Sequence, residues 1–422
     1  MKLKVGSKKA FVFVFIIGVI LGVMAGKIMI NNRNAVADKN YIDSQKQKLE
    51  VENKVQSDNL LNDNELEKDD EKIDKEEIII EDGIKVVPTV LDGIAGNSAY
   101  CPTFQIVWNE LADKFVDGKE VVFINDKVKM ADNLNEKTFT KEDISDEYYY
   151  VKVGKQILSV KKEIEDGIKD KFNETSEILD MVNWVDDTKL ENTDDINSFI
   201  FYTMLKRNFE FNKPFDVLDE NGMFKNYMNV KYFGINDKSD SALRAQVDVL
   251  FYNNESDFAA KLKTKDNDEV IVLRVEEDKY TNFEEVYTYL EKQTKDFNGE
   301  KKFTADDYLK VPNLKFNVVK KYEELKDKPF LDKDNNTHVI SEAIQTIEFE
   351  LDNKGGKLKS EALIATKNAM IFEEKPVEKR YIYLTDNFYM FLKEENKDKP
   401  YFALKVEDIK DFQDEAQLLE NN

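Results

Sequence analysis

The stretch VISEAIQTIEFELDNKG, which spans residues 339–355, contains an alternating pattern near its end. Ile347, Phe349 and Leu351 are apolar, and they alternate with Glu348 and Glu350. Successive side chains of a β-strand point to opposite faces of a sheet. This period of two therefore predicts a strand with one buried face and one face in water.

The regions around this stretch add further strands and, earlier in the chain, helices. Val270–Leu273 and Phe388–Leu392 are short continuous apolar runs, as in strands covered on both faces. Apolar residues recur at helical spacing from Phe104 to Phe115 and again from Ile157 to Phe172. Helices followed mainly by strands, without a repeating strand-helix-strand order, predict an α+β fold.

Composition narrows the possible functions. The chain has 422 residues and a formal net charge of -23, which repels phosphate backbones and argues against nucleic acid as a partner. It holds one cysteine, Cys101, and one histidine, His338. These numbers exclude an intrachain disulfide framework and a Cys/His zinc cage. Ser-His-Asp catalysis would have to use His338, so we expect neither an enzyme nor a cofactor.

The N-terminal residues 1–30 combine a basic start with an apolar segment, residues 10–30, that reads AFVFVFIIGVILGVMAGKIMI. Four lysines precede the segment, so the N-terminus should be cytoplasmic and the rest of the chain extracytoplasmic. We favour an uncleaved single-pass anchor in the cell membrane. The alternative is a signal peptide cleaved after Ala25 or Ala37, which would release a secreted protein.

Residues 31–96 are rich in charged and amide side chains without a sustained apolar face, which predicts a flexible stalk. Within this region, residues 76–80 are predicted either as a short strand or as an apolar, aggregation-prone part of the stalk. A folded domain is expected over residues 97–422. The heavy use of Lys, Asn and Ile indicates an AT-rich genome, such as that of a Gram-positive bacterium.

Several segments of the predicted domain follow one another in a familiar order. They are Asn97–Ala112, Ile168–Asp180, Phe199–Phe215, Val247–Leu273, Val311–Leu325, Val339–Gly355 and Tyr381–Val406. This order resembles the serpin family over about 300 residues. The first segment resembles the first helix of the family, and the last resembles its closing strands. The resemblance implies mixed, mainly antiparallel sheets packed with helices, in a protein that we expect to be a monomer.

The strand that ends at Gly355 resembles the one that leads into the reactive loop of serpins. In that family a protease cleaves the exposed loop, which then inserts into the central sheet as an extra strand. The resemblance implies that the loop hinge comprises Gly355, Gly356, Leu358, Ser360 and Ala362. From Gly356 onward these small or apolar residues alternate with Lys357, Lys359 and Glu361.

An inserted strand needs this alternation, although any half-buried strand shows it too. A shift by one residue would turn Lys357 and Lys359 inward and prevent insertion. The usual loop length places the scissile bond at Ala369-Met370, which would suit an elastase-like or subtilisin-like serine protease outside the cell. The stretch after Gly355 is several residues longer than usual, so the bond could lie elsewhere.

The sequence departs from the family at three polar positions. The Ser-Pro-x-Ser cluster that helps the sheet to open is expected after Val121–Phe123, where the chain has Ile124–Lys127. The family's histidine four residues after Ser341 is replaced by Gln345, and the asparagine of the central strand by Thr203. These replacements weaken the inhibitory interpretation.

Other clusters suggest no site. Asp332–Asn336 has the opening spacing of a calcium loop but lacks the sixth-position Gly and the twelfth-position Glu, so we interpret it as a polar turn. We predict no catalytic or metal-binding residues. The leading hypothesis is a membrane-tethered inhibitor of serine-type endopeptidases with an exposed reactive loop. The alternative is a non-inhibitory serpin-fold module that binds partners or has a structural role at the cell surface.

Overall fold

The computed structural model describes residues 79–80, 83–176, 179–180, 182–188, 198–218, 222–357 and 379–419. These residues belong to one unit that extends from Glu76 to Asn422. The predicted anchor, residues 10–30, lies outside the described residues. Among the helices that are described, none is long and apolar enough to cross a membrane.

The strand predicted from the alternating pattern is β17 (Thr337–Asp352), in the middle of an eight-stranded sheet. Ile347, Phe349 and Leu351 are buried, and Glu348 is exposed, so the predicted half-buried strand is confirmed. On one side β17 pairs antiparallel with β15. On the other side it pairs with β5, parallel, and with β18. The bounds of the other strands in this sheet are β1 (Ile79–Ile80), β4 (Tyr149–Lys155), β5 (Ser198–Leu205), β6 (Asn208–Glu210), β15 (Leu314–Lys321), β16 (Pro329–Leu331) and β18 (Gly355–Lys357).

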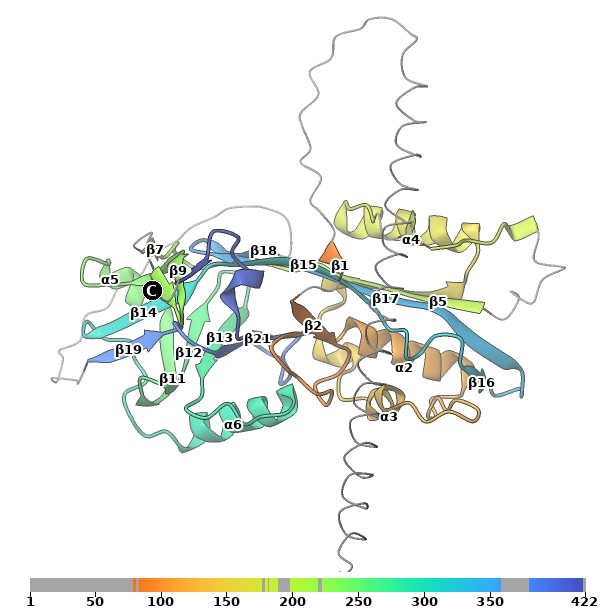
Figure 1. The fold of residues 1–422 in the computed structure, drawn as a ribbon, viewed down its shortest axis with the longest axis horizontal. Coiled ribbons are helices and arrows are strands. Elements are labelled where there is room, and N and C mark those ends of the chain that lie inside the picture. Colours follow the sequence, from red (N-terminus) through yellow and green to blue (C-terminus); the bar gives the residue numbers. More distant parts are fainter. Residues whose placement is uncertain are drawn as a thin grey trace, which may run out of the picture. The chain divides into compact units, whose positions relative to one another are not determined.

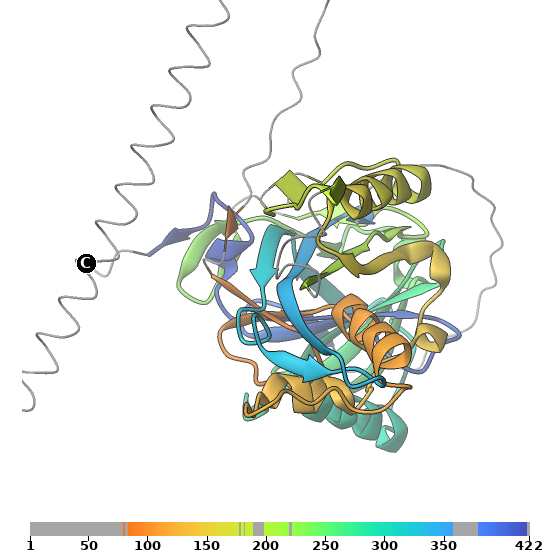
Figure 2. The ribbon, with the colours of Figure 1, turned by 90° about the vertical axis from the view of Figure 1, so that its right-hand side faces the viewer.

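Two helices cover opposite faces of this sheet. The helix α2 (Thr103–Phe115) buries Phe104, Val107 and Trp108 against Ile340 and Ala343 of β17. The helix α4 (Leu158–Phe172) packs on the other face, against Ile344 of β17 and its neighbours. Figures 1 and 2 show α4 and α2 on either side of the sheet. Both helices predicted from apolar spacing are therefore confirmed.

The two continuous apolar runs pair with each other in a seven-stranded sheet. Val270 lies opposite Leu392, and both are fully buried, as predicted for strands covered on both faces. One face of this sheet joins the main core, and the other packs under α6 (Phe283–Asp296). In order across the sheet, the strands are β11 (Val247–Asn254), β12 (Asp257–Lys263), β13 (Asp268–Arg274), β20 (Phe388–Glu394), β21 (Phe402–Val406), β3 (Asn97–Tyr100) and β2 (Ile84–Val87).

Two smaller sheets complete the described strands. The four-stranded sheet has the order β19 (Arg380–Tyr383), β14 (Asp307–Pro312), β10 (Tyr232–Ile235) and β7 (Asp216–Val217). The three-stranded sheet has the order β22 (Gln417–Leu418), β9 (Tyr227–Val230) and β8 (Gly222–Phe224). The remaining helices are α3 (Lys129–Asn135), α5 (Ser241–Arg244) and the 3-10 turns η1 (Lys141–Asp143), η2 (Asp146–Tyr148) and η6 (Ile409–Asp411).

The start of the folded part corrects two predictions. The strand β2 pairs in parallel with β3 and buries Ile84, Val86 and Val87, so the fold begins before Asn97. Asn97–Tyr100 is itself a strand, and the first long helix starts only at Thr103. The apolar runs involved are short and lie next to charged sequence, so composition alone does not separate them from a stalk.

Candidate functional site

Gly355 and Gly356, the first two residues of the predicted hinge, belong to the short strand β18, which lies between β17 and β6 and runs antiparallel to both. Gly356 is opposite Leu351 on one side and opposite Phe209 on the other. Leu351 and Phe209 are each 1% exposed, so Gly356 belongs to the core face of the sheet.

Both hinge glycines are required by close packing. A Cβ atom at Gly356 would overlap the ring of Phe209. Gly355 has a φ of +155°, and a Cβ atom there would overlap the backbone oxygen of Phe209. Gly355 thus occupies a backbone region that favours glycine. Without side chains, these two residues let the chain enter the sheet between β17 and β6.

Beyond the hinge, the sheet is closed by direct pairing of β17 with β5. The parallel register extends from Val339, opposite Ser198, to Gln345, opposite Thr203. After Gln345 in the sequence, the partner of β17 changes, and Glu350–Asp352 pair with β18 instead of β5. A strand that continued from β18 would have to separate β17 from β5. The described state therefore has the start of an extra strand in place and the rest of its position occupied by the β5–β17 pairing.

A buried polar cluster lies where β5 and β17 begin to part. The Gln345 side-chain amide donates to the backbone oxygen of Cys101 at 3.1 Å and to Thr103 Oγ1 at 3.0 Å. Tyr322 donates to Gln345 Oε1 at 2.5 Å, and Thr203 donates to Thr103 Oγ1 at 3.0 Å. Each of these residues is buried. The cluster joins both strands to the first turn of α2, so separating the strands must break hydrogen bonds inside the core.

The segment that meets Gln345 and Thr203 lies at the start of α2. Gln345 and Thr203 are opposite each other in the register of β17 and β5, and both contact Thr103. Phe123 forms an isolated bridge with Phe330 of β16. Ile124–Lys127 therefore supplies none of the side-chain hydrogen bonds that Gln345 and Thr203 form among the described residues.

A buried ion pair fixes the strand β6 that receives the hinge. Arg207, between β5 and β6, contacts Asp268 of β13 with its Nη2 at 2.6 Å from Oδ2. Tyr401 donates to the other carboxylate oxygen at 3.0 Å, and the ring of Tyr148 lies 3.4 Å from the guanidinium carbon. Burial raises the pKa of Asp268 to about 6, whereas Arg207 and Tyr401 act in the opposite direction. The carboxylate is thus charged at neutral pH and holds β6 to the seven-stranded sheet.

A second buried ion pair anchors the chain after the loop. Arg380, at the start of β19, contacts Asp307 of β14 through two hydrogen bonds of 2.8 and 2.7 Å. Its guanidinium also donates to the backbone oxygens of Glu300 and Lys302. The Asp307 side chain is fully buried. The two ends of the loop therefore belong to different sheets, the first to the eight-stranded sheet and the second to the four-stranded sheet.

The structure describes only the first two of the predicted loop residues. Gly355 and Gly356 are described, but Leu358, Ser360 and Ala362 lie outside the described residues. The candidate scissile bond, Ala369-Met370, lies outside them too. No sequence motif indicated the two buried arginines. Arg207 lies between β5 and β6, and Arg380 is the first residue of β19.

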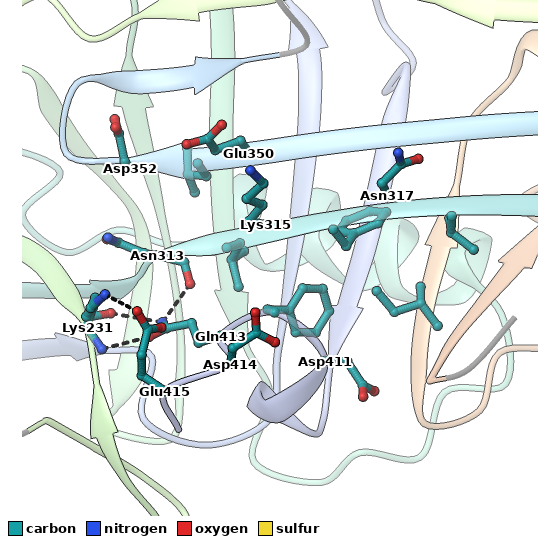
Figure 3. Close-up of a pocket in the computed structure, with 16 residues that line it drawn as sticks. Lys231, Asn313, Lys315, Asn317, Glu350, Asp352, Asp411, Gln413, Asp414 and Glu415 are labelled. Carbon is teal, nitrogen blue, oxygen red and sulfur yellow. Dashed lines mark hydrogen bonds and ion pairs between the residues drawn. The ribbon is translucent and has the colours of Figure 1, made fainter. Parts of the chain in front are cut away.

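A groove near the hinge lies on the opposite side of β17. It has a volume of about 600 Å³ and is lined by β15, by Glu350–Asp352 of β17 and by the segment Asp411–Glu415. Figure 3 shows Gln413 joined to Lys231 and Asn313 by hydrogen bonds along its wall. Insertion next to β18 would take place across β17 from this groove.

The histidine of the chain lies in a polar turn next to β17. His338 contacts Asp332 at 2.8 Å, next to the rings of Phe115 and Phe330. Asp332 accepts from the backbone of Asp334 and Asn336, which makes this segment a polar turn. Within the described ranges, no group of three or more His, Cys, Asp or Glu side chains could hold a metal ion.

Comparisons with known proteins gave the following results. No family model and no curated protein matches the sequence. Among solved structures, the chain is similar to human thyroxine-binding globulin complexed with thyroxine, with 12% identity, 73% of this chain and 91% of that chain covered, and a TM-score of 0.42. It is similar to human glycosylated kallistatin, with 11% identity, coverages of 74% and 91%, and a TM-score of 0.43. It is also similar to a highly specific serpin of the insect Tenebrio molitor, with 10% identity, coverages of 72% and 94%, and a TM-score of 0.38.

The arrangement of the described elements agrees with the serpin resemblance in its decisive parts. The strand before the loop lies in the central sheet, and the hinge lies beside it on the side of β5. The closing strands β19, β20 and β21 lie in the two sheets that follow. The described strands and helices therefore form the mixed sheets packed with helices that the serpin resemblance implies.

Proposed function

We propose that this serpin-like protein inhibits serine proteases by inserting its cleaved loop into the eight-stranded sheet. The observation that carries the proposal is the hinge, since β18 is already paired with both β17 and β6. Gly356 lies on the core face there, which is the register that insertion needs. If the strand continues in this register, Leu358, Ser360 and Ala362 face the core, and the positions of Lys359 and Glu361 face water.

The same register supports a gain in stability after cleavage. An inserted strand would bury Leu358 and Ile364, each worth roughly 1.5–3 kcal/mol when fully buried. It would also form antiparallel pairs with β17 and β5, which are only parallel to each other in the described state. Against this gain stand the hydrogen bonds that join Thr203 and Gln345 to Thr103. Each neutral hydrogen bond contributes about 0.5–1.5 kcal/mol, so the burial of Leu358 and Ile364 is the larger of these two contributions.

A non-inhibitory role is the second candidate, as a surface module that binds partners or has a structural function. The polar cluster favours it, because Gln345 and Thr203 are fully engaged with Thr103 and hold β5 and β17 together. Both replace the family's residues. If β5 and β17 cannot separate, the protein would keep its fold but could not trap a protease.

Covalent complex formation with a protease separates the two functions. The full-length protein in detergent is incubated with an elastase-like and a subtilisin-like protease and then analysed on denaturing gels. We expect an SDS-stable complex, because insertion traps the acylated protease. The variant Ser360→Asp should be cleaved without forming the complex, since an unpaired charge would have to be buried. The matched control is Glu361→Asp, which keeps a carboxylate at a position that faces water, and it should trap normally. Cleavage of the wild type without complex would assign the non-inhibitory role.

We further propose that residues 10–30 hold the protein in the cell membrane, with the serpin-like domain outside. The length of the apolar segment and the lysines before it support this placement. Full-length protein should remain in the membrane fraction after a carbonate wash. Recovery of the domain from the medium, with a new N-terminus after Ala25 or Ala37, would instead support cleavage and secretion.

A further inference from the structure

A second site lies on the seven-stranded sheet, away from the hinge. It is a pocket of about 310 Å³ bounded by α6, β3, β20 and the segment around Val90. Five aromatic side chains line it, namely Tyr100, Phe139, Phe283, Tyr287 and Phe391. All except Tyr287 are almost completely buried and form the floor. The apolar surface that a ligand can reach is provided by the partly exposed Val90, Leu91 and Tyr287.

The framework around the pocket is held by hydrogen bonds. The segment before β3 is tied to the start of α6, because Glu284 donates its backbone N–H to Val90 at 3.1 Å and Ile94 donates to Thr281 at 2.9 Å. Asn133 of α3 donates to Asp92 in the same segment at 2.9 Å. The walls are thus fixed before any ligand arrives, which lowers the entropy cost of binding.

The floor of the pocket carries a hydroxyl that lacks a partner among the described residues. Tyr100 is 1% exposed and lines the pocket, and no hydrogen bond joins its hydroxyl to another described residue. Burial raises the pKa of Tyr100 well above its ordinary value, and the charge of Glu284 adds to the effect. This hydroxyl is therefore neutral and available to bond a polar atom in the pocket.

Three carboxylates line the rim, from Glu284, Glu291 and Asp398. Within the described ranges, no lysine or arginine forms an ion pair with any of them. Lys399 also lines the pocket and is paired with Asp143 at 3.2 Å, and the nearby Lys393 is paired with Glu269 at 2.9 Å. Burial and the charges of Glu284 and Asp398 raise the pKa of Glu291. The rim is therefore a concentration of negative charge that a cation would relieve.

We propose that this pocket binds a small organic cation, a protonated amine attached to an apolar ring-sized body. The body would rest on Val90 and Leu91, and the ammonium would lie near Glu291 and the face of Tyr287. Cations are attracted both to carboxylates and to aromatic faces. The Tyr100 oxygen would accept a hydrogen bond from the ammonium. The reactive loop plays no part in this site, so the inference stands apart from protease inhibition.

Calorimetric titration of the full-length protein tests the charge preference with three probes that share one ring system. Tryptamine carries an ammonium, indole-3-propionate a carboxylate, and 3-methylindole no charge. We expect tryptamine to bind at one site and the anion to bind at least about tenfold more weakly. The neutral probe should fall between them. Equal affinity for the three probes, or no saturable binding of tryptamine, would overturn the proposal.

Two variants locate the site. Glu291→Gln removes one rim charge from an exposed position, and Tyr100→Phe removes only the buried hydroxyl. Each should weaken tryptamine binding by about 3- to 10-fold. The control Glu277→Gln makes the same charge change at an exposed residue outside the pocket and should leave the affinity unchanged. Thermal midpoints confirm that the variants are folded. Loss of binding in the control, or full affinity in both pocket variants, would contradict the assignment.

Discussion

Replacing Asp307 by Asn is expected to destabilise the folded protein by about 3–5 kcal/mol, the range found when one partner of a buried ion pair is removed. The change would leave the Arg380 guanidinium buried with no opposing charge. Arg380 would keep its hydrogen bonds to the backbone oxygens of Glu300 and Lys302, but these cannot neutralise it. Urea denaturation of the wild type and the variant measures the effect.

An exposed ion pair provides the control for this prediction. Lys279 and Glu277 are 67% and 78% exposed, so Lys279→Met should change the free energy of unfolding by less than about 1 kcal/mol. The double variant Asp307→Leu with Arg380→Met removes both buried charges and should be more stable than Asp307→Asn alone. A cost below 1 kcal/mol for Asp307→Asn would show that the pair does not anchor the end of the loop.

Replacing Gly356 by Val is expected to expel the hinge from the sheet or to strain the core around it. A Cβ atom at this position overlaps the ring of Phe209, which is 1% exposed and has little room to move. Overpacking of this kind costs about 1–3 kcal/mol. The same clash should abolish trapping of a protease, because the hinge is the first part of the inserted strand. Urea denaturation and the gel assay for the covalent complex report on the two effects.

A smaller side chain at position 209 should relieve the overlap that Gly356→Val creates. Combining Gly356→Val with Phe209→Ala should recover part of the lost stability, since the two residues are in direct register. Lys354→Val introduces the same side chain in the exposed turn just before β18 and should have little effect on stability or on trapping. Normal trapping by Gly356→Val would show that the hinge does not enter the sheet in this register.

The sequence predicted the elements that carry a strong local pattern. The alternation at Ile347–Leu351 and the helical spacing around Trp108 were confirmed, because burial follows directly from such periods. The first strands were missed, since Ile84–Val87 is a four-residue run beside charged sequence. The prediction that the first helix begins at Asn97 was wrong, and no local pattern indicated that Cys101-Pro102-Thr103 contacts Gln345.

The long-range parts of the site could not be predicted from local sequence. Arg207 meets Asp268, and Arg380 meets Asp307, across 61 and 73 residues of chain. No spacing rule links such distant charges, and only the packing of the sheets brings them together. The register of the hinge was likewise open in the sequence. Pairing with Leu351 and Phe209 decides it, because Gly356 must share their face.

The central claim is that the loop continues from β18 into the sheet once it is cut, and the thermal midpoint tests it most directly. The full-length protein is cleaved in the loop by a subtilisin-like protease, and its midpoint is compared with that of the intact protein. Burial of Leu358 and Ile364 predicts a rise of at least about 5 °C, at roughly 2–4 °C for each kcal/mol gained. An unchanged or lower midpoint after complete cleavage would contradict insertion.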